Sequence, residues 1–364
     1  MPDSAATLAA AARLSQHFRA AGAVPVHADI LQPAETLLDL YGEDIRARAY
    51  VTRDPVAGEV LLRPDFTVPV VQAHMTNGAE PARYTYEGPV FRKQEAPGNR
   101  AREYLQVGYE LFDRTDPAAA DAEVFALIAA ALEGLPLRPV TGDIGLLRAA
   151  VEGLSLSDHR RAALMRHIWR PARFRALIER FTGRGPLAEA RAALTDRLRA
   201  APAEALMAEA GPMIGLRSKD EIAARVATLL ADAEEPPLPE AEVALIDAVL
   251  AVAMPARAAL TALRALDWAA LTPALARLER RLDALDARGI DSAALPFEAS
   301  FGRSSMEYYD GFVFGFVAEG ADLPPVATGG RYDALTAVLG QGRAIPAVGG
   351  VIRPAVVAAL EGAP

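Results

Sequence analysis

The apolar positions of the chain follow two different periods along its 364 residues. Residues 4–22 carry apolar side chains at helical spacing and end at Gly22. Residues 121–135 show the same spacing, which stops at Gly134. Between them, an Arg-Asp-Pro-Val-Ala-Gly turn at residues 53–58 separates two β-branched runs. That turn predicts a hairpin, and residues 83–112 have strand character again.

The pattern changes to helix from about residue 150 to 290, where Ala, Leu and Arg dominate and EEPPLPEAE at 234–242 interrupts the helices. Strand chemistry returns at residues 295–317, and VATGGRYDALTAVLG and IPAVGGVIRPAVVAAL then alternate strand with helix. This order predicts an α+β core formed by residues 1–150 and 290–364, which a helical insertion module at residues 151–289 divides.

Composition narrows the possible functions of the chain. Hydrophobic residues make up 52% and charged residues 23%, and no apolar run approaches the roughly 18 residues of a membrane-spanning helix. The opening MPDSAATLAAAARLSQHF lacks a cationic n-region, so we expect an amphipathic helix and a cytoplasmic protein without a membrane role. The absence of cysteine excludes disulfides, thiolate nucleophiles and thiolate metal sites.

Motifs for common cofactors are absent from the sequence. It contains no phosphate loop of the GxxxxGK[ST] type, no GxGxxG, no GxSxG and no HExxH, and its five histidines are scattered, so we expect neither a metal nor a cofactor. The net charge of -9 argues against a surface that coats nucleic acid. The most basic segment, residues 158–184, is interpreted as a solvated helix face, with RNA or an anionic partner as the alternative.

Polar residues share one face of the strand that precedes the helix at 121–135. Alternate residues of a strand point to the same side, so five residues lie together: Arg102, Tyr104, Gln106, Gly108 and Glu110. The opposite face is apolar. A charged gap at the glycine suits a small zwitterion, whereas the alternative is the ordinary wet face of an antiparallel sheet.

Three other segments add polar residues and glycines at predicted strands. RPDFTVPV places Asp65 and Thr67 after a strand, and EYYDGFVFGF places Tyr308 and Tyr309 on one. TGGRYDAL places Gly329, Gly330 and Arg331 at a strand-to-helix turn. Together with the strand at 102–110, these segments predict a single site.

In this order the four segments resemble the catalytic core of histidyl-tRNA synthetase, over residues 5–150 and 295–350. RPDFT stands where that family has Arg-Pro-Glu-x-Thr, FRKQEAPGNRAREYLQVGYE is similar to class II motif 2, and GGRYDAL and PAVGG match the closing pocket and the motif 3 region. The resemblance implies a class II aminoacyl-tRNA synthetase-like antiparallel sheet flanked by helices, with a helical insertion.

The resemblance also implies a histidine pocket. Its candidates are Asp65, Thr67, Gln106, Glu110, either Tyr308 or Tyr309, Arg331 and Tyr332. A carboxylate pair would hold the ammonium group, and amide or phenol groups would meet the imidazole. Arg92, Arg100 and Arg102 correspond to the motif 2 arginines that face ATP phosphates in a synthetase, and are interpreted as vestigial.

The departures from the synthetase pattern concern catalysis. Gln94 replaces the acid of the motif 2 Arg-x-Glu, and Ser304 to Tyr309 replace Arg-Gly-Leu-Asp-Tyr-Tyr, which leaves Arg303 one residue out of register. The motif 3 arginine falls on Val356, whereas Arg353 comes too early. Losing one such electrostatic donor typically costs about 10²–10³-fold in rate. We therefore expect no adenylation. The sequence ends at EGAP soon after motif 3, without an anticodon-binding domain, so no tRNA is expected.

This combination is similar to the ATP phosphoribosyltransferase regulatory subunit family of histidine biosynthesis. The resemblance implies a non-catalytic homodimer within a larger hetero-oligomer, required by a short-form catalytic subunit and helping histidine to inhibit it. One alternative is a truncated synthetase-like enzyme that activates histidine or another amino acid for a non-tRNA acceptor, because Arg92 and Arg102 are retained. A second is an amino-acid-binding or RNA-interaction module.

Overall fold

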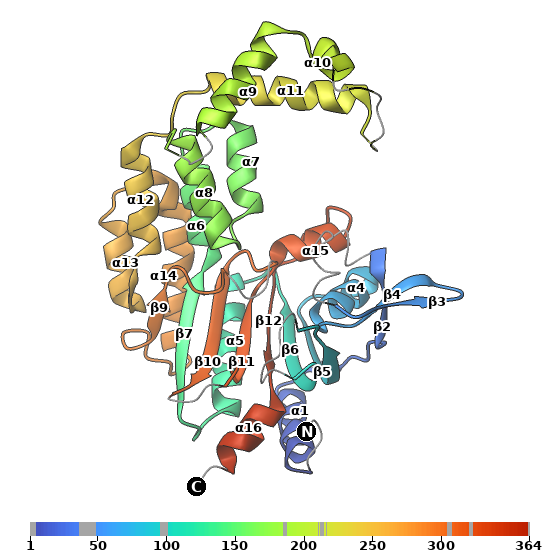
Figure 1. Ribbon diagram of the computed structural model, residues 1–364. Coiled ribbons are helices and arrows are strands. Elements are labelled where there is room, and N and C mark those ends of the chain that lie inside the picture. Colours follow the sequence, from blue (N-terminus) through green and yellow to red (C-terminus); the bar gives the residue numbers. More distant parts are fainter. Residues whose placement is uncertain are drawn as a thin grey trace. The chain divides into compact units, whose positions relative to one another are not determined.

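The computed structural model describes residues 5–35, 49–94, 101–184, 188–209, 211, 215, 217–303, 308–319 and 323–362, with the backbone alone at Asn77, Ala188 and Ala190 (Figure 1). The chain divides into two compact units, Met1–Leu147 with Val249–Pro364, and Arg148–Ala248. We call these the sheet unit and the helical unit. None of the described helices is both long and apolar enough to cross a bilayer.

The described part of the sheet unit contains a nine-stranded sheet with the order β1-β5-β6-β12-β11-β10-β7-β9-β8. Neighbouring strands run antiparallel except β1 with β5 and β7 with β9. The strands are β1 (Val24–Pro25), β5 (Ala82–Phe91), β6 (Glu103–Phe112), β7 (Leu137–Asp143), β8 (Ala253–Pro255), β9 (Pro296–Glu298), β10 (Phe312–Ala318), β11 (Ala327–Arg331) and β12 (Ala347–Ile352). The sheet is thus mainly antiparallel, as the sequence predicted.

A smaller sheet has the order β2-β4-β3, with β2 (Leu31–Pro33), β3 (Val51–Asp54) and β4 (Gly58–Leu62). The predicted hairpin at residues 53–58 joins β3 to β4. The Asp54 carboxylate accepts backbone N–H bonds from Val56 and Ala57 at 2.8 and 2.7 Å, which closes the turn. Gly58 has a φ of +78°, a backbone conformation that favours glycine.

Helices cover both faces of the nine-stranded sheet (Figure 1). Phe18 of α1 contacts Tyr109 of β6, whose hydroxyl donates to Glu123 of α5, so α1 and α5 share one face. The start of α4, which packs beside α15, lies on the other. The helices in the described part of this unit are α1 (Ala5–Ala20), α4 (Thr67–Asn77), α5 (Pro117–Ala131), α13 (Ala256–Arg264), η1 (Ala269–Leu271), α14 (Thr272–Asp286), α15 (Asp333–Leu339) and α16 (Pro354–Glu361).

The strand β6 is buried on both faces from Gln106 to Phe112. Val107 and Tyr109 are each 0% exposed on the α1 and α5 face, and Gln106 and Glu110 are each 1% exposed on the face of α4. The wet-face interpretation of this strand is therefore wrong. A buried carboxylate and a buried amide need hydrogen-bond partners, because leaving such groups unpaired is costly.

The helical unit is built from α6 (Ile144–Glu152), which enters it, then α7 (Asp158–Arg166), α8 (Pro171–Phe181), α9 (Ala188–Ala200), α10 (Ala203–Glu209), α11 (Lys219–Glu234) and the start of α12 (Glu240–Leu250). The α11 helix begins with a reciprocal capping box between Ser218 and Glu221. The sequence placed the insertion at residues 151–289, whereas the compact unit ends at Ala248. The α14 helix packs against α5 and thus joins the sheet unit.

Candidate ligand pocket

Glu110 lies at the centre of a buried cluster of hydroxyl groups. Its Oε1 accepts hydrogen bonds from Thr67 Oγ1 at 3.0 Å and from the Tyr86 hydroxyl at 3.0 Å. Its Oε2 accepts one from the Tyr332 hydroxyl at 2.5 Å. These donors come from the start of α4, from β5 and from the junction of β11 with α15, so three separate segments converge on one carboxylate of β6.

Burial raises the pKa of Glu110 from 4.5 to about 7. The hydrogen bonds from the three hydroxyl groups oppose that rise, because they favour the ionised carboxylate, and the charge of Asp65 adds to it. Glu110 therefore titrates near neutrality, in the same range as an imidazole.

Two glycines allow this arrangement. A Cβ atom on Gly349, which pairs with Glu110 across β12, would lie 1.5 Å from Glu110 Oε2. A Cβ atom on Gly108 would lie 2.1 Å from the ring of Tyr86. The ring of Tyr86 thus fills the space above Gly108, and the prediction that this gap takes a ligand is wrong.

Sequence reasoning missed Tyr86, although the register of the β5–β6 pair contains the signal. Tyr86 stands directly opposite Gly108, where an aromatic ring can cover a glycine. Phe66 stacks on the Tyr86 ring with centroids 4.4 Å apart, and the guanidinium of Arg63 lies 4.0 Å from the Phe66 centroid. This stack holds the Tyr86 hydroxyl against Glu110.

Two further acceptors lie buried in this part of the unit. Asp65 is 5% exposed, and burial raises its pKa, whereas the charge of Arg92 and backbone N–H bonds from Val68 and Thr67 lower it. Gln106 follows the alternation of β6 onto the face of Glu110, and its buried Oε1 has no hydrogen-bond partner among the described residues. A cationic amine is the kind of ligand that such acceptors bind.

Both predicted tyrosines belong to the cluster. The Tyr308 hydroxyl donates to Thr67 Oγ1 at 3.3 Å, and its ring lies 6.0 Å from that of Tyr332. Tyr309 is buried, and burial together with the charges of Glu110 and Asp65 raises its pKa. Neither lies on a strand, because β10 begins only at Phe312, so that part of the prediction is wrong.

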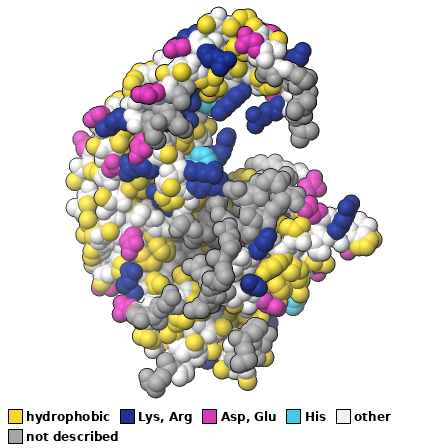
Figure 2. Space-filling view, viewed as in Figure 1, with side chains coloured by type: hydrophobic (Ala, Val, Ile, Leu, Met, Phe, Trp, Pro, Cys, Tyr) yellow, Lys and Arg dark blue, Asp and Glu magenta, His cyan; other side chains and the backbone are white. Residues whose placement is uncertain are grey.

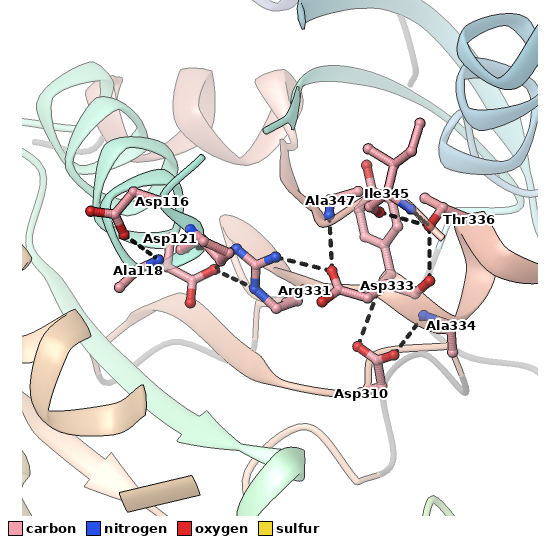
Figure 3. A network of polar contacts seen from close by, with 12 residues as sticks. Asp116, Ala118, Asp121, Asp310, Arg331, Asp333, Ala334, Thr336, Ile345 and Ala347 are labelled. Atoms are coloured by element: carbon pink, nitrogen blue, oxygen red, sulfur yellow. Dashed lines mark hydrogen bonds and ion pairs between the residues drawn. The ribbon is translucent and has the colours of Figure 1, made fainter. Parts of the chain in front are cut away.

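The Arg331 side chain does not join this cluster but lies between Asp121 and Asp333 (Figure 3). Its guanidinium donates to Asp121 of α5 at 2.7 and 2.9 Å, to Asp333 at 3.0 Å and to the carbonyl of Pro117 at 2.7 Å. Tyr332, the next residue, points to Glu110 instead. The prediction that Arg331 lines the pocket is therefore wrong. Arg331 forms a buried ion pair with Asp121 of α5 instead.

The predicted phosphate-facing arginines are only partly described. Arg100 lies outside the described residues, and Arg102 is exposed. Arg92 donates from Nε to the carbonyl of Pro64 at 3.2 Å, next to Asp65. Arg353, which motif spacing excluded, lies 5.9 Å from the Tyr104 ring centroid, and its pKa is lowered by burial and by the charge of Arg92.

Comparison with known proteins identifies the fold of the chain. The profile of the family described as histidyl-tRNA synthetase matches residues 1–236 and 215–356. A crystal structure of an "ATP phosphoribosyltransferase regulatory subunit/histidyl-tRNA synthetase" from Bacillus halodurans superposes with a TM-score of 0.69 at 20% identity, covering 100% of this chain and 82% of that one. A histidine–tRNA ligase subunit from Alicyclobacillus acidocaldarius has a TM-score of 0.61 at 24% identity, covering 99% and 95%. The fold is thus that of the histidyl-tRNA synthetase-like class II proteins.

Sequence relatives narrow this class. Proteins named ATP phosphoribosyltransferase regulatory subunit are 34% identical in Allorhizobium ampelinum, over 96% of this chain and 95% of the relative, and 35% identical in Agrobacterium fabrum, over 93% of each. A protein of the same name in Mesorhizobium japonicum is 34% identical over 94% of each. The chain belongs to the family of ATP phosphoribosyltransferase regulatory subunits.

Proposed function

We propose that this chain is a non-catalytic cytoplasmic subunit that activates a short-form ATP phosphoribosyltransferase catalytic subunit, and that histidine binds at Glu110 to inhibit the assembly. Family membership supports the regulatory role. The observation that carries the histidine site is the buried set of acceptors formed by Asp65, Gln106 and Glu110, surrounded by hydroxyl donors.

The chemistry of the cluster suits histidine. Asp65 and the unpartnered Gln106 Oε1 are acceptors for an ammonium group. Glu110 can accept from an imidazole N–H, and the phenol of Tyr308 or Tyr309 can donate to the other ring nitrogen. A hydrogen bond from the imidazole N–H to the ionised Glu110 carboxylate is charge-assisted and therefore stronger than one between neutral groups.

Regulation requires that histidine bind two states of the assembly with different affinity. A coupling free energy of about 1–3 kcal/mol between sites is typical and suffices for feedback. We propose a homodimer of this chain within a larger hetero-oligomer as the assembly that changes state. Tyr332 and Tyr308 belong to segments that join the pocket to α15 and β10, so a ligand at Glu110 would act directly on both elements.

The test mixes the purified chain with the short-form catalytic subunit and measures formation of phosphoribosyl-ATP with and without histidine. We expect the chain to raise the rate and histidine to lower it again. Glu110→Gln keeps an oxygen for Thr67 and Tyr86 but loses the charge, so it should weaken inhibition. Glu103→Gln is the matched control, because Glu103 is an exposed carboxylate on the same strand. No activation would refute the regulatory role, whereas normal inhibition of the Glu110 variant would refute the pocket assignment.

Pyrophosphate exchange distinguishes this proposal from amino-acid activation. Gln94 and Val356 stand where a synthetase carries a glutamate and an arginine, and Val356 is buried on α16. We therefore expect no histidine-dependent exchange of pyrophosphate into ATP by the purified chain. Exchange well above a no-enzyme control would favour the truncated-enzyme alternative. Arg92 and Arg353 would then be the candidate residues for binding the ATP phosphates.

A further inference from the structure

Four arginines of the helical unit surround one buried carboxylate. Asp232 of α11 is 6% exposed, and Arg160 of α7 donates from Nε to its Oδ1 at 2.7 Å. Arg191 of α9 donates to its Oδ2. The charge of Arg180 of α8 also acts on Asp232, and Arg225 of α11 completes the group because its charge acts on Arg180. We call these five residues the Asp232 cluster.

The cluster has more positive than negative charge. Asp232 has both oxygens occupied, and the Glu235 carboxylate pairs with Arg160 at 3.2 Å. The remaining donors of Arg160 bind carbonyl groups of Asp232, Glu235 and Pro236. These two carboxylates therefore face four guanidinium groups, and four of the five N–H donors of Arg160 are already used within the cluster.

Arg180 and Arg225 differ from Arg160 and Arg191 in having no acid bonded to them in the part of the chain that the structure describes. Neither forms a hydrogen bond or an ion pair with any described residue, and Arg180 Nε is buried without an acceptor. The Arg180 guanidinium lies 4.8 Å from the centroid of Phe181, which fixes one side of it. Burial lowers the pKa of Arg180, and repulsion from Arg191, Arg160 and Arg225 lowers it further, although Asp232 opposes this. An anion placed here would relieve both effects.

A groove of about 700 Å³ adjoins the cluster, because Asp232 and Glu235 line it. Ser155, His159, Arg161 and Thr228 supply further polar groups to its walls. This volume is typical of small-molecule sites. Figure 2 shows Lys and Arg side chains gathered over the helical unit in the region of α7 and α11.

We propose that Arg180, Arg191 and Arg225 bind the phosphate group of a small phosphorylated metabolite, whose uncharged part occupies the adjoining groove. Planar guanidinium forks bind phosphate oxygens in pairs, and several arginines around one phosphate are a recurrent arrangement. An acidic peptide segment offers carboxylates instead, but the half-buried Arg180 and the size of the adjoining groove, about 700 Å³, favour a small ligand over an extended chain.

The test is isothermal titration of the full chain at low salt with ribose 5-phosphate, inorganic phosphate, ribose and a poly-glutamate peptide. We expect one ribose 5-phosphate per chain, weaker binding of phosphate and none of ribose. The double variant Arg180→Gln/Arg225→Gln should weaken ribose 5-phosphate at least about tenfold, since hydrogen bonds to charged groups are among the strong ones.

The control is Arg175→Gln/Arg199→Gln, which removes the same charge from α8 and α9. Arg175 and Arg199 are exposed and pair with Asp247 and Asp196, so ribose 5-phosphate affinity should stay within about twofold of wild type. Arg225→Gln alone, at an exposed position, provides the test if the double variant loses helicity by circular dichroism. Absence of ribose 5-phosphate binding, an equal loss in both double variants, or binding of the peptide alone would overturn the proposal.

Discussion

Glu110 makes the stability of the sheet unit depend on pH in a way that one substitution removes. Burial raises its pKa from 4.5 to about 7, so the folded chain holds this proton more tightly than the unfolded chain does. The contribution of Glu110 to the free energy of unfolding is therefore largest below about pH 4.5 and is lost as the pH rises through about 7. At about 1.4 kcal/mol per pKa unit, the loss between about pH 5 and 8.5 is about 2–3 kcal/mol.

The perturbation is Glu110→Gln, because glutamine does not titrate and its carbonyl oxygen can still accept from Thr67 and Tyr86. Urea unfolding is followed by fluorescence in a Trp169→Phe background, which leaves Trp268 of the sheet unit as the single tryptophan. The free energy of unfolding of the Gln variant, relative to its parent, should rise by about 2–3 kcal/mol from about pH 5 to about 8.5.

The matched control is Glu103→Gln in the same background, since Glu103 is exposed. Its free-energy difference from the parent should be nearly constant over this pH range. If the Glu110 difference is equally flat, the folded chain does not raise the pKa of this carboxyl group, and the account of the pocket electrostatics is refuted.

Three more predictions follow from buried contacts. Arg331→Met takes the principal partner from the buried Asp121 and should lower the free energy of unfolding by about 3–5 kcal/mol in urea titrations. Burial lowers the pKa of His74, so the folded chain binds this proton more weakly than the unfolded chain does. The free energy of unfolding should therefore fall as the pH drops below about 6.5, and His74→Phe should make that fall smaller. Gly349→Ala puts a Cβ atom 1.5 Å from Glu110 Oε2 and should abolish histidine binding measured calorimetrically.

The Arg331 and Gly349 variants each have a control within the chain. Arg138→Met breaks a partly exposed ion pair with Glu298 at 3.6 Å and should cost less than about 1 kcal/mol. Gly362→Ala adds a Cβ atom in ordinary contact, 3.4 Å from the nearest atom, and should leave histidine binding unchanged. Comparable effects in a variant and its control would show that the contact in question has no special importance.

The helical periodicity of the sequence did not show where the helical unit ends. Residues 256–286 have the apolar spacing of the helices before them, so the sequence extended the insertion to 289. In the structure α14 packs against α5, and its Arg281 pairs with Asp143 of β7 at 2.6 Å. Periodicity shows that a helix has an apolar face, but only the tertiary structure shows which core that face joins.

The sequence by itself determined the local properties of the candidate site. Alternation along β6 placed Gln106 and Glu110 on one face, and the order of segments predicted that Asp65 and Thr67 would meet them, as Thr67 does. Both inferences depend on the two-residue period of a strand and on the resemblance, which are readable from consecutive residues.

The tertiary structure decided what no consecutive residues contain. Strand register placed Tyr86 over Gly108, so a tyrosine fills the predicted gap. The same alternation that brings Tyr332 to Glu110 sends Arg331 to Asp121 of α5. Such outcomes depend on which strand lies opposite and which helix covers each face, and these are set by packing between segments distant in the chain.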